Sequence, residues 1–339
     1  MGRSQQHTPF PLFDYSGGIN TKFSETVLAE NEAVEILNSH LTARGGLEKR
    51  RGFLPYITGD TATTLAIVGL YQFLRTGTDY VVRVENAKVE YNLAGVWTDI
   101  TGAVTVSTTA SDRWVFSTFR DNLIATNGTN VPIKWPGTGN ATVITRAIGG
   151  GADTIDKAAT LVRHRERIVI GDVTATESAV QTRYDSVIWP SDSGTLDTWS
   201  AAPAGKIHID QGDGDSVTNL QDLLGYLVVF TQHSLHRVID HGVTATQDRV
   251  RVAPVGTPGR HTAVVAGNLV YFLDEVGQLW SYDVRGDNED AVTNLSINKI
   301  GRDTLTDFVS TRLPYAHLHY DPRRDEIYCF LSQDAATTT

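Results

Sequence analysis

The chain has 339 residues, of which 40% are apolar, and it carries a formal net charge of −10. This is enough apolar material for a large core, whereas the acidic balance argues against non-specific nucleic-acid binding, which needs a basic surface. The single cysteine, Cys329, excludes disulfide frameworks and cysteine-rich metal sites. It lies in an apolar run, so we expect a buried thiol.

Residues 1–55 are expected to form an extended N-terminal arm that contains a short helix. Within it, Ala29, Ala33, Ile36 and Leu37 have the spacing of one face of an amphipathic helix. The arm has too few apolar residues to fold alone, so we expect it to dock on the rest of the chain or on a neighbouring subunit. The residues expected to make these contacts are Phe13, Ile19, Ile36, Leu37, Lys49, Arg50, Arg51 and Phe53.

Residues 56–339 contain recurring pairs of β-runs joined by tight turns. The clearest pair covers residues 266–274 and 279–284, with Gly277 in the turn between them. Because such units recur at roughly 35–60 residues, and a four-stranded blade cannot bury both faces alone, they must stack around an axis. We predict an all-β fold, a β-propeller of about six blades (range five to eight). The units are centred on Val81, Val115, Val169, Val228, Val270 and Tyr328.

Two units are irregular in the sequence. In the third, residues 172–185 are expected to be a long insertion between two β-runs. The last, residues 315–331, is followed by no further β-run. Either an N-terminal strand completes the last blade, or this polypeptide is one piece of a longer chain; closed β architectures favour the first reading.

Two groups of residues are candidate metal ligands. Asp210, Asp213 and Asp215 place three carboxylates within six residues, as a weak calcium candidate. They lack a completing bidentate glutamate, and turn formation by glycine and aspartate explains the same pattern. His317 and His319 would share one face of a strand, but a metal site needs three or four ligands, so we expect half-buried strand histidines. No cofactor is expected.

Residues 191–199 are similar to the Asp-box turn of sialidase-type propellers. Ser193 stands where that motif has aspartate, and the motif occurs once rather than in every blade. Because no set of catalytic groups can be assigned, we predict that the protein is not an enzyme. The basic residues at 163–167 and 49–51 are expected to form a solvated rim or intersubunit salt bridges.

The order of several motifs resembles a family of bacteriophage tail proteins, the β-propeller nozzle, tail-tubular and head–tail stabilisation proteins of short-tailed phages. The resemblance begins with GGINT at residues 17–21, LAENEA at 28–33 and RGGLEKRRGF at 44–53. It continues with VIWPS at 187–191, LGYLVVFT at 224–231, GNLVYFLDEVG at 267–277 and YDPRRDEIY at 320–328. Arg51 departs from the proline that the family usually has.

The resemblance implies a structural virion protein of the tail or head–tail junction, made in the cytoplasm of a bacterial host. It implies a ring-shaped homo-oligomer, often a hexamer, that contacts other tail, portal or adaptor proteins and extends or closes the DNA channel. DNA would pass without specific binding, which an acidic wall favours, and no membrane contact is expected. The alternatives are a monomeric propeller that acts as a protein-interaction scaffold and a carbohydrate-active propeller enzyme.

Overall fold

The computed structural model describes residues 18–19, 29, 31–33, 39–41, 46–49, 66–109, 111–199, 205–210, 214–239, 248–295 and 309–332. The chain divides into two compact units: Met1–Asp60 with Asn294–Asp307, and Thr61–Thr293 with Phe308–Thr339. In the first unit, β1 (Gly18–Ile19) pairs in parallel with β2 (Glu32–Ala33). There, too, β3 (Ser39–Leu41) pairs antiparallel with β4 (Leu47–Lys49).

The short helix predicted for the N-terminal arm is wrong at two of its residues. Glu32 and Ala33 form β2, while residues 30 and 34–38 lie outside the described residues. The apolar spacing covers only one or two helical turns, which is too short to offset the cost of helix nucleation. Pairing with β1 decides the local structure instead.

The larger unit holds six sheets within the described residues, five with four strands and one with two. We call them blades 1 to 6. Blade 1 is β5 (Gly69–Arg75), β6 (Thr78–Glu85), β7 (Lys88–Leu93) and β8 (Val96–Asp99); blade 2 is β9 (Val115–Phe119), β10 (Asn122–Thr126), β11 (Ile133–Trp135) and β12 (Thr142–Val143); blade 3 is β13 (Thr154–His164), β14 (Arg167–Glu177), β15 (Val180–Pro190) and β16 (Ile207–His208). Blade 4 is β17 (Val217–Leu223), β18 (Tyr226–Thr231), β19 (Leu235–Ile239) and β20 (Asp248–Ala253); blade 5 is β21 (Ala263–Ala266), β22 (Leu269–Leu273), β23 (Leu279–Asp283) and β24 (Val292–Asn294); blade 6 is β25 (His317–Asp321) and β26 (Glu326–Phe330). Two short 3-10 helices are η2 (Glu289–Ala291) and η3 (Ser310–Tyr315).

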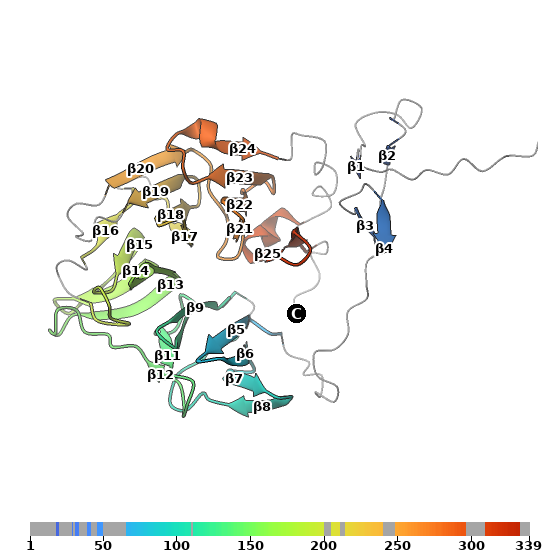
Figure 1. The fold of residues 1–339 in the computed structure, drawn as a ribbon. Helices are drawn as coiled ribbons and strands as arrows, with labels where there is room; N and C mark the ends of the chain where they lie inside the picture. The colour runs from blue at the N-terminus through green and yellow to red at the C-terminus, as the bar shows by residue number, and fades with distance from the viewer. Residues whose placement is uncertain are drawn as a thin grey trace, which may run out of the picture. The chain divides into compact units, whose positions relative to one another are not determined.

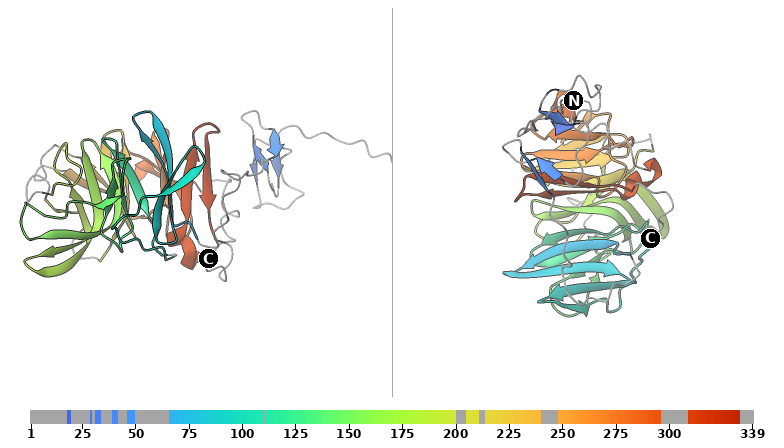
Figure 2. Two further views of the ribbon diagram at one scale, coloured as in Figure 1. Left: turned by 90° about the horizontal axis from the view of Figure 1, so that it is seen from below. Right: turned by 90° about the vertical axis from the view of Figure 1, so that its right-hand side faces the viewer.

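The blades follow one another around a common axis in chain order (Figure 1). Each blade contacts the next through its first strand: β5 contacts β9, β9 contacts β13, β13 contacts β17, β17 contacts β21 and β21 contacts β25. First strands that neighbour one another in this way surround the axis of a β-propeller. The predicted fold class is confirmed. The strands of blade 3, which have 11 residues each in β13, β14 and β15, extend beyond those of the neighbouring blades (Figure 2).

The alternation of side chains along each strand explains why the blades stack. In β10, Leu123 and Ala125 point into the apolar cluster shared with blade 1, while Ile124 points into the cluster shared with blade 3. Successive residues of a strand face opposite sides of the sheet, so an apolar strand supplies both interfaces. A separate apolar cluster lies between each pair of consecutive blades.

Tight two-residue turns connect many of the strands within a blade. Among the described residues, three of them have glycine at the second position and both residues at positive φ: Thr76–Gly77, Ala94–Gly95 and Leu224–Gly225. The turn at Ser178–Ala179 also has positive φ at both positions (50° and 63°). It contains neither glycine nor asparagine.

The insertion predicted at residues 172–185 is wrong, because these residues lengthen two strands. They complete β14 and begin β15, which pair from Val173 with Tyr184 to Glu177 with Val180. The Ser178–Ala179 turn carries no sequence signal for a hairpin. The segment therefore resembles an irregular loop in the sequence alone.

In the described residues, blade 6 has two strands, β25 and β26. That an N-terminal strand completes this blade stays a prediction. Cys329 in β26 is exposed, so the predicted buried thiol is wrong. Its strand is the outer one of the described pair, and an apolar run at that position does not guarantee burial on both faces.

Candidate functional site

Most of the predicted docking residues lie outside the described residues: Phe13, Ile36, Leu37, Arg50, Arg51 and Phe53. Ile19 is the second residue of β1, and Lys49 is the exposed last residue of β4. Their role in assembly stays a prediction.

The candidate calcium residues are only partly described. Asp215 is buried, and its carboxylate accepts hydrogen bonds from the Thr231 hydroxyl (2.6 Å), the His233 amide (3.0 Å) and the Ser234 hydroxyl (3.0 Å). It therefore anchors the turn between β18 and β19. The backbone oxygen of Asp210 accepts a hydrogen bond from the Ser186 hydroxyl, and Asp213 lies outside the described residues.

His317 and His319 lie two residues apart on β25 and are both exposed, which is more than the expected half-burial. The ring of His317 stacks on His261, with 5.0 Å between centroids. In the part of the chain that the structure describes, no group of three or more histidine, cysteine or acidic residues is arranged to hold a metal ion.

The Asp-box-like segment joins two blades. Trp199 is buried, and its indole N–H donates to the backbone oxygen of Thr145 (2.8 Å). Asp197 accepts a hydrogen bond from the ammonium group of Lys134 at 2.6 Å. Lys134 lies in β11 of blade 2 and Thr145 comes just after β12, so this segment fixes blade 3 against its neighbour.

The basic run at residues 163–167 also joins blades within one chain. The His164 ring nitrogen Nδ1 lies 2.7 Å from a carboxylate oxygen of Asp222 in blade 4. Glu166 lies 3.2 Å from the guanidinium of Arg120 in blade 2. These contacts lie within one chain, whereas the run was expected to form a solvated rim or intersubunit salt bridges; intersubunit contacts of the run stay a prediction.

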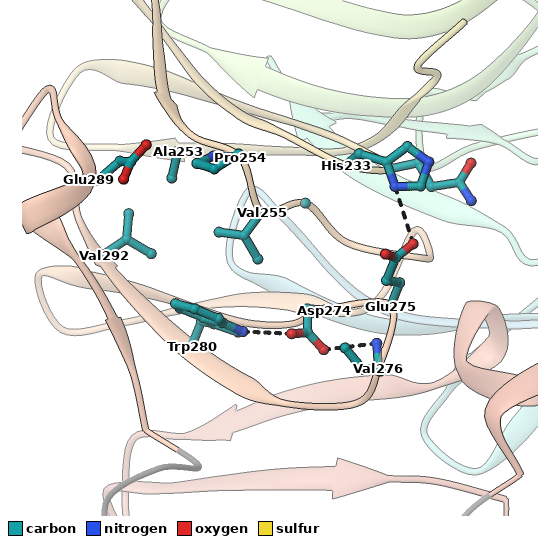
Figure 3. A pocket seen from close by; sticks show the side chains of 12 residues that line it. His233, Ala253, Pro254, Val255, Asp274, Glu275, Val276, Trp280, Glu289 and Val292 are labelled. Atoms are coloured by element: carbon teal, nitrogen blue, oxygen red, sulfur yellow. Dashed lines mark hydrogen bonds and ion pairs between the residues drawn. The ribbon is translucent and has the colours of Figure 1, made fainter.

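A groove of about 480 Å³ lies between blades 4 and 5, and we call it the blade 4–5 groove. Its volume falls in the ~300–1,000 Å³ range of ligand pockets. Figure 3 shows the side chains that line it. The lining residues come from the β18–β19 turn, the end of β20 and the segment after it, the β22–β23 turn, β23, η2 and β24: Gln232, His233, Ala253, Pro254, Val255, Gly256, Asp274, Glu275, Val276, Trp280, Glu289 and Val292.

The β22–β23 turn forms one wall of the groove and is held by Asp274. This side chain is 5% exposed. Its carboxylate accepts hydrogen bonds from the amides of Val276 (2.9 Å) and Gln278 (2.7 Å), and from the indole N–H of Trp280 (2.9 Å). Aspartate commonly closes a turn by accepting from amides two residues further on. Here the same carboxylate also sets the orientation of the indole (Figure 3).

The opposite wall is the segment that leaves β20. Its backbone passes so close to blade 4 that a Cβ on Gly256 would lie 2.2 Å from the carbonyl oxygen of Thr231. Glycine is therefore required at this crossing. The crossing brings Val255 toward Trp280 and Val292, and these three side chains form the apolar half of the groove (Figure 3).

The other half of the groove is polar and acidic. His233 Nδ1 from blade 4 lies 3.2 Å from Glu275 Oε2 of blade 5, and both side chains are more than half exposed. Glu289 adds a second exposed carboxylate. An exposed pair of this kind stabilises little. An indole ring beside exposed carboxylates, however, is an arrangement that attracts cations.

The groove was not predicted from the sequence, although both β-runs of blade 5 were recognised there. Trp280 lies in a strand-like run, where an aromatic residue is expected in the core. The groove depends on the segment after β20, which contacts blade 5 only in the folded chain. A polar turn that begins with aspartate and precedes a tryptophan by six residues is the one signal available in the sequence.

No protein-family model matches the chain, and no curated protein matches it. Among solved structures, BamB from Moraxella catarrhalis is 12% identical over 67% of this chain and 61% of that chain, with a TM-score of 0.42. The Pan2 WD40 domain from Neurospora crassa is 10% identical over 63% of this chain and 61% of that one (TM-score 0.39). YCF48 from Cyanidioschyzon merolae is 8% identical over 81% and 98% (TM-score 0.35). The chain spans 61% of the length of the first two structures. These likenesses concern the fold alone, and the fold assignment rests on the sheet order of this chain.

Within the described residues, no helix has the length and apolar character needed to cross a membrane.

Proposed function

We propose that the protein is a non-enzymatic β-propeller that works by binding other proteins, and that the blade 4–5 groove is one of its binding surfaces. The observation that carries the proposal is the combination of an apolar half, built from Val255, Trp280 and Val292, with exposed carboxylates at Glu275 and Glu289. Grooves with a few aromatic anchors and a polar rim are typical of protein-binding surfaces.

The charge of the groove selects the partner. Its titratable side chains are His233, Asp274, Glu275 and Glu289, and lysine and arginine are absent from its lining. A peptide segment that carries arginine or lysine next to an aliphatic residue would place its cation near the carboxylates and the Trp280 ring. Its aliphatic residue would contact Val255 and Val292. An acidic segment would be repelled.

The test uses a fluorescent peptide of alternating arginine and leucine, with a glutamate–leucine peptide of equal length as its counterpart. We expect saturable binding of the basic peptide only, measured by fluorescence anisotropy. Trp280→Ala should weaken it at least tenfold, and the pair Glu275→Gln with Glu289→Gln should weaken it severalfold and reduce its salt dependence. Glu166→Gln, an exposed carboxylate in blade 3, is the matched control. Equal affinity for Trp280→Ala and the unaltered protein, with both folded by circular dichroism, would refute this role of the groove.

A second candidate setting follows from the leader resemblance at residues 17–53. In it, the same interaction propeller is a subunit of a phage tail or head–tail junction ring, and its assembly rather than any single site identifies it. Supporting it are the ordered motifs of the leader and the exposed Lys49 at the end of β4. A ring subunit needs large side-to-side interfaces.

Electron microscopy and mass photometry of the purified full chain separate the two settings. A ring, sixfold in the simplest case, is expected for the virion role, and removal of residues 1–53 should abolish it while the propeller stays folded. If the protein remains monomeric across concentrations and is absent from phage particles, the virion role is refuted and the monomeric scaffold is supported.

A further inference from the structure

A second cavity, of about 200 Å³, lies where the first strands of several blades begin. Its walls include Arg113 before β9, Arg260 before β21 and Tyr315 before β25, together with Asp172 in β14. Because the first strands surround the propeller axis, a cavity built from the segments that precede them lies at the axis. We call it the axial cavity. It shares no lining residue with the blade 4–5 groove.

Arg260, which precedes blade 5, reaches two segments of blade 2, one before β9 and one just after β10. Its Nη1 donates to the backbone oxygens of Arg113 (3.1 Å) and Asn127. Gly128, at φ +76°, leaves space for the rest of the guanidinium, since a Cβ there would lie 2.5 Å from Nη2. Both acceptors are neutral carbonyl groups, so they orient the cation without neutralising it.

Arg113 is the second cation of the cavity. Its Nε is buried and has no hydrogen-bond partner, and its guanidinium carbon lies 5.8 Å from the centre of the Tyr315 ring. Burial lowers the pKa of both Arg113 and Arg260 from the usual value for arginine. In the described parts of the chain, neither guanidinium forms an ion pair. A desolvated cation without a counter-ion is costly, and a bound anion relieves that cost.

The nearby carboxylates are engaged elsewhere. Asp172 accepts two hydrogen bonds from Arg183, at 2.7 and 2.8 Å. Asp112 accepts from three hydroxyl groups, among them that of Thr129 at 2.6 Å. Both carboxylates favour the charged form of Arg260 from a distance.

The adjoining histidines add no positive charge to the cavity. Burial lowers the pKa of His261 to about 3, with further lowering by His317, Arg260 and Arg113. Although His317 is exposed over much of its residue surface, its ring packs against His261, and the loss of water around the ring lowers the pKa of His317. At neutral pH these rings are uncharged, and the arginines supply the local charge.

We propose that the axial cavity binds a small oxyanion, with phosphate as the model ligand, between the guanidinium groups of Arg113 and Arg260. Guanidinium groups donate in a planar fork that matches the oxygens of phosphate and carboxylate. The cavity is smaller than the ~300–1,000 Å³ of pockets for drug-sized ligands, so it suits one anionic group. The alternative is that Arg260 has only a structural role and holds the blades together, in which case added anions change neither the heat of titration nor the Tm.

The test is isothermal titration calorimetry of inorganic phosphate into the full chain, at constant ionic strength set with sodium chloride. We expect saturable binding of one phosphate per chain, accompanied by a rise in Tm. Arg113→Gln, which removes the unpaired cation and leaves the Arg260 clamp, should weaken binding at least tenfold. Arg260→Lys should also weaken it, because lysine keeps the charge but loses the fork.

Arg285→Gln is the control, since that arginine is exposed, paired with Asp283 and absent from the lining of the axial cavity. Acetate in place of phosphate shows whether a carboxylate suffices. No saturable heat and no phosphate-dependent Tm shift would overturn the proposal, and so would unchanged phosphate affinity in a folded Arg113→Gln variant. Either result would leave the blade 4–5 groove untouched, because the two sites are tested with different ligands and variants.

Discussion

Replacing Asp274 with alanine tests whether one carboxylate organises the wall of the blade 4–5 groove. The side chain accepts three hydrogen bonds, from Val276 (2.9 Å), Gln278 (2.7 Å) and the Trp280 indole (2.9 Å). A hydrogen bond to a charged group contributes about 1.5–3 kcal/mol when its partner stays desolvated. Val276 is 66% exposed, so its amide regains water in the variant. We therefore expect Asp274→Ala to lower the free energy of unfolding by about 2–4 kcal/mol.

The assay is urea unfolding followed by far-ultraviolet circular dichroism. A double-mutant cycle with Trp280→Phe, which deletes the indole N–H and keeps most of the ring, should give a coupling of about 1–2 kcal/mol. Asp290→Ala, an exposed aspartate in the same blade, should stay within about 0.5 kcal/mol. A loss below about 0.5 kcal/mol for Asp274→Ala, or a coupling near zero, would refute the reasoning. The groove would then be shaped by backbone packing alone.

Two further predictions concern a close backbone approach and a buried titratable group. In Gly256→Ala, the new Cβ would meet the backbone of Thr231 at 2.2 Å and of Gln232 at 2.6 Å. We therefore expect the free energy of unfolding in urea to fall by about 3 kcal/mol or more. Gly151→Ala has room for a Cβ and should change it by less than about 1 kcal/mol; similar losses for both variants would contradict the steric argument. The pKa of His261 is lowered to about 3 from 6.5, so between these values the unfolded chain binds a proton that the folded protein does not, and stability falls as the pH decreases through this window. His261→Gln should flatten the dependence of the urea midpoint on pH there, and an unchanged slope would be evidence against the burial of this ring.

Turn chemistry decided which strands could be predicted from the sequence. Thr76–Gly77 and Ala94–Gly95 contain glycine at a position of positive φ, and parts of the strands on either side of these turns could be recognised from the sequence. Ser178–Ala179 adopts the same backbone without either favoured residue. The energetic cost of that turn is met by the long pairing of β14 with β15, which a local pattern does not reveal. The sequence therefore supports the fold class better than the limits of individual strands.

Neither candidate site could be predicted from the sequence, because each is assembled by segments that connect blades. Arg260 donates to the backbone of a residue 147 positions away, and neither Arg260 nor Arg113 belongs to a basic run that would attract attention. A formal charge of −10 describes the average surface, which governs solubility and long-range encounter. It says little about one local cavity, where two guanidinium groups without an ion-pair partner among the described residues set the local charge. In a propeller, each blade contributes one linking segment to the axis, so a strongly charged site can arise there from residues that are isolated in the sequence.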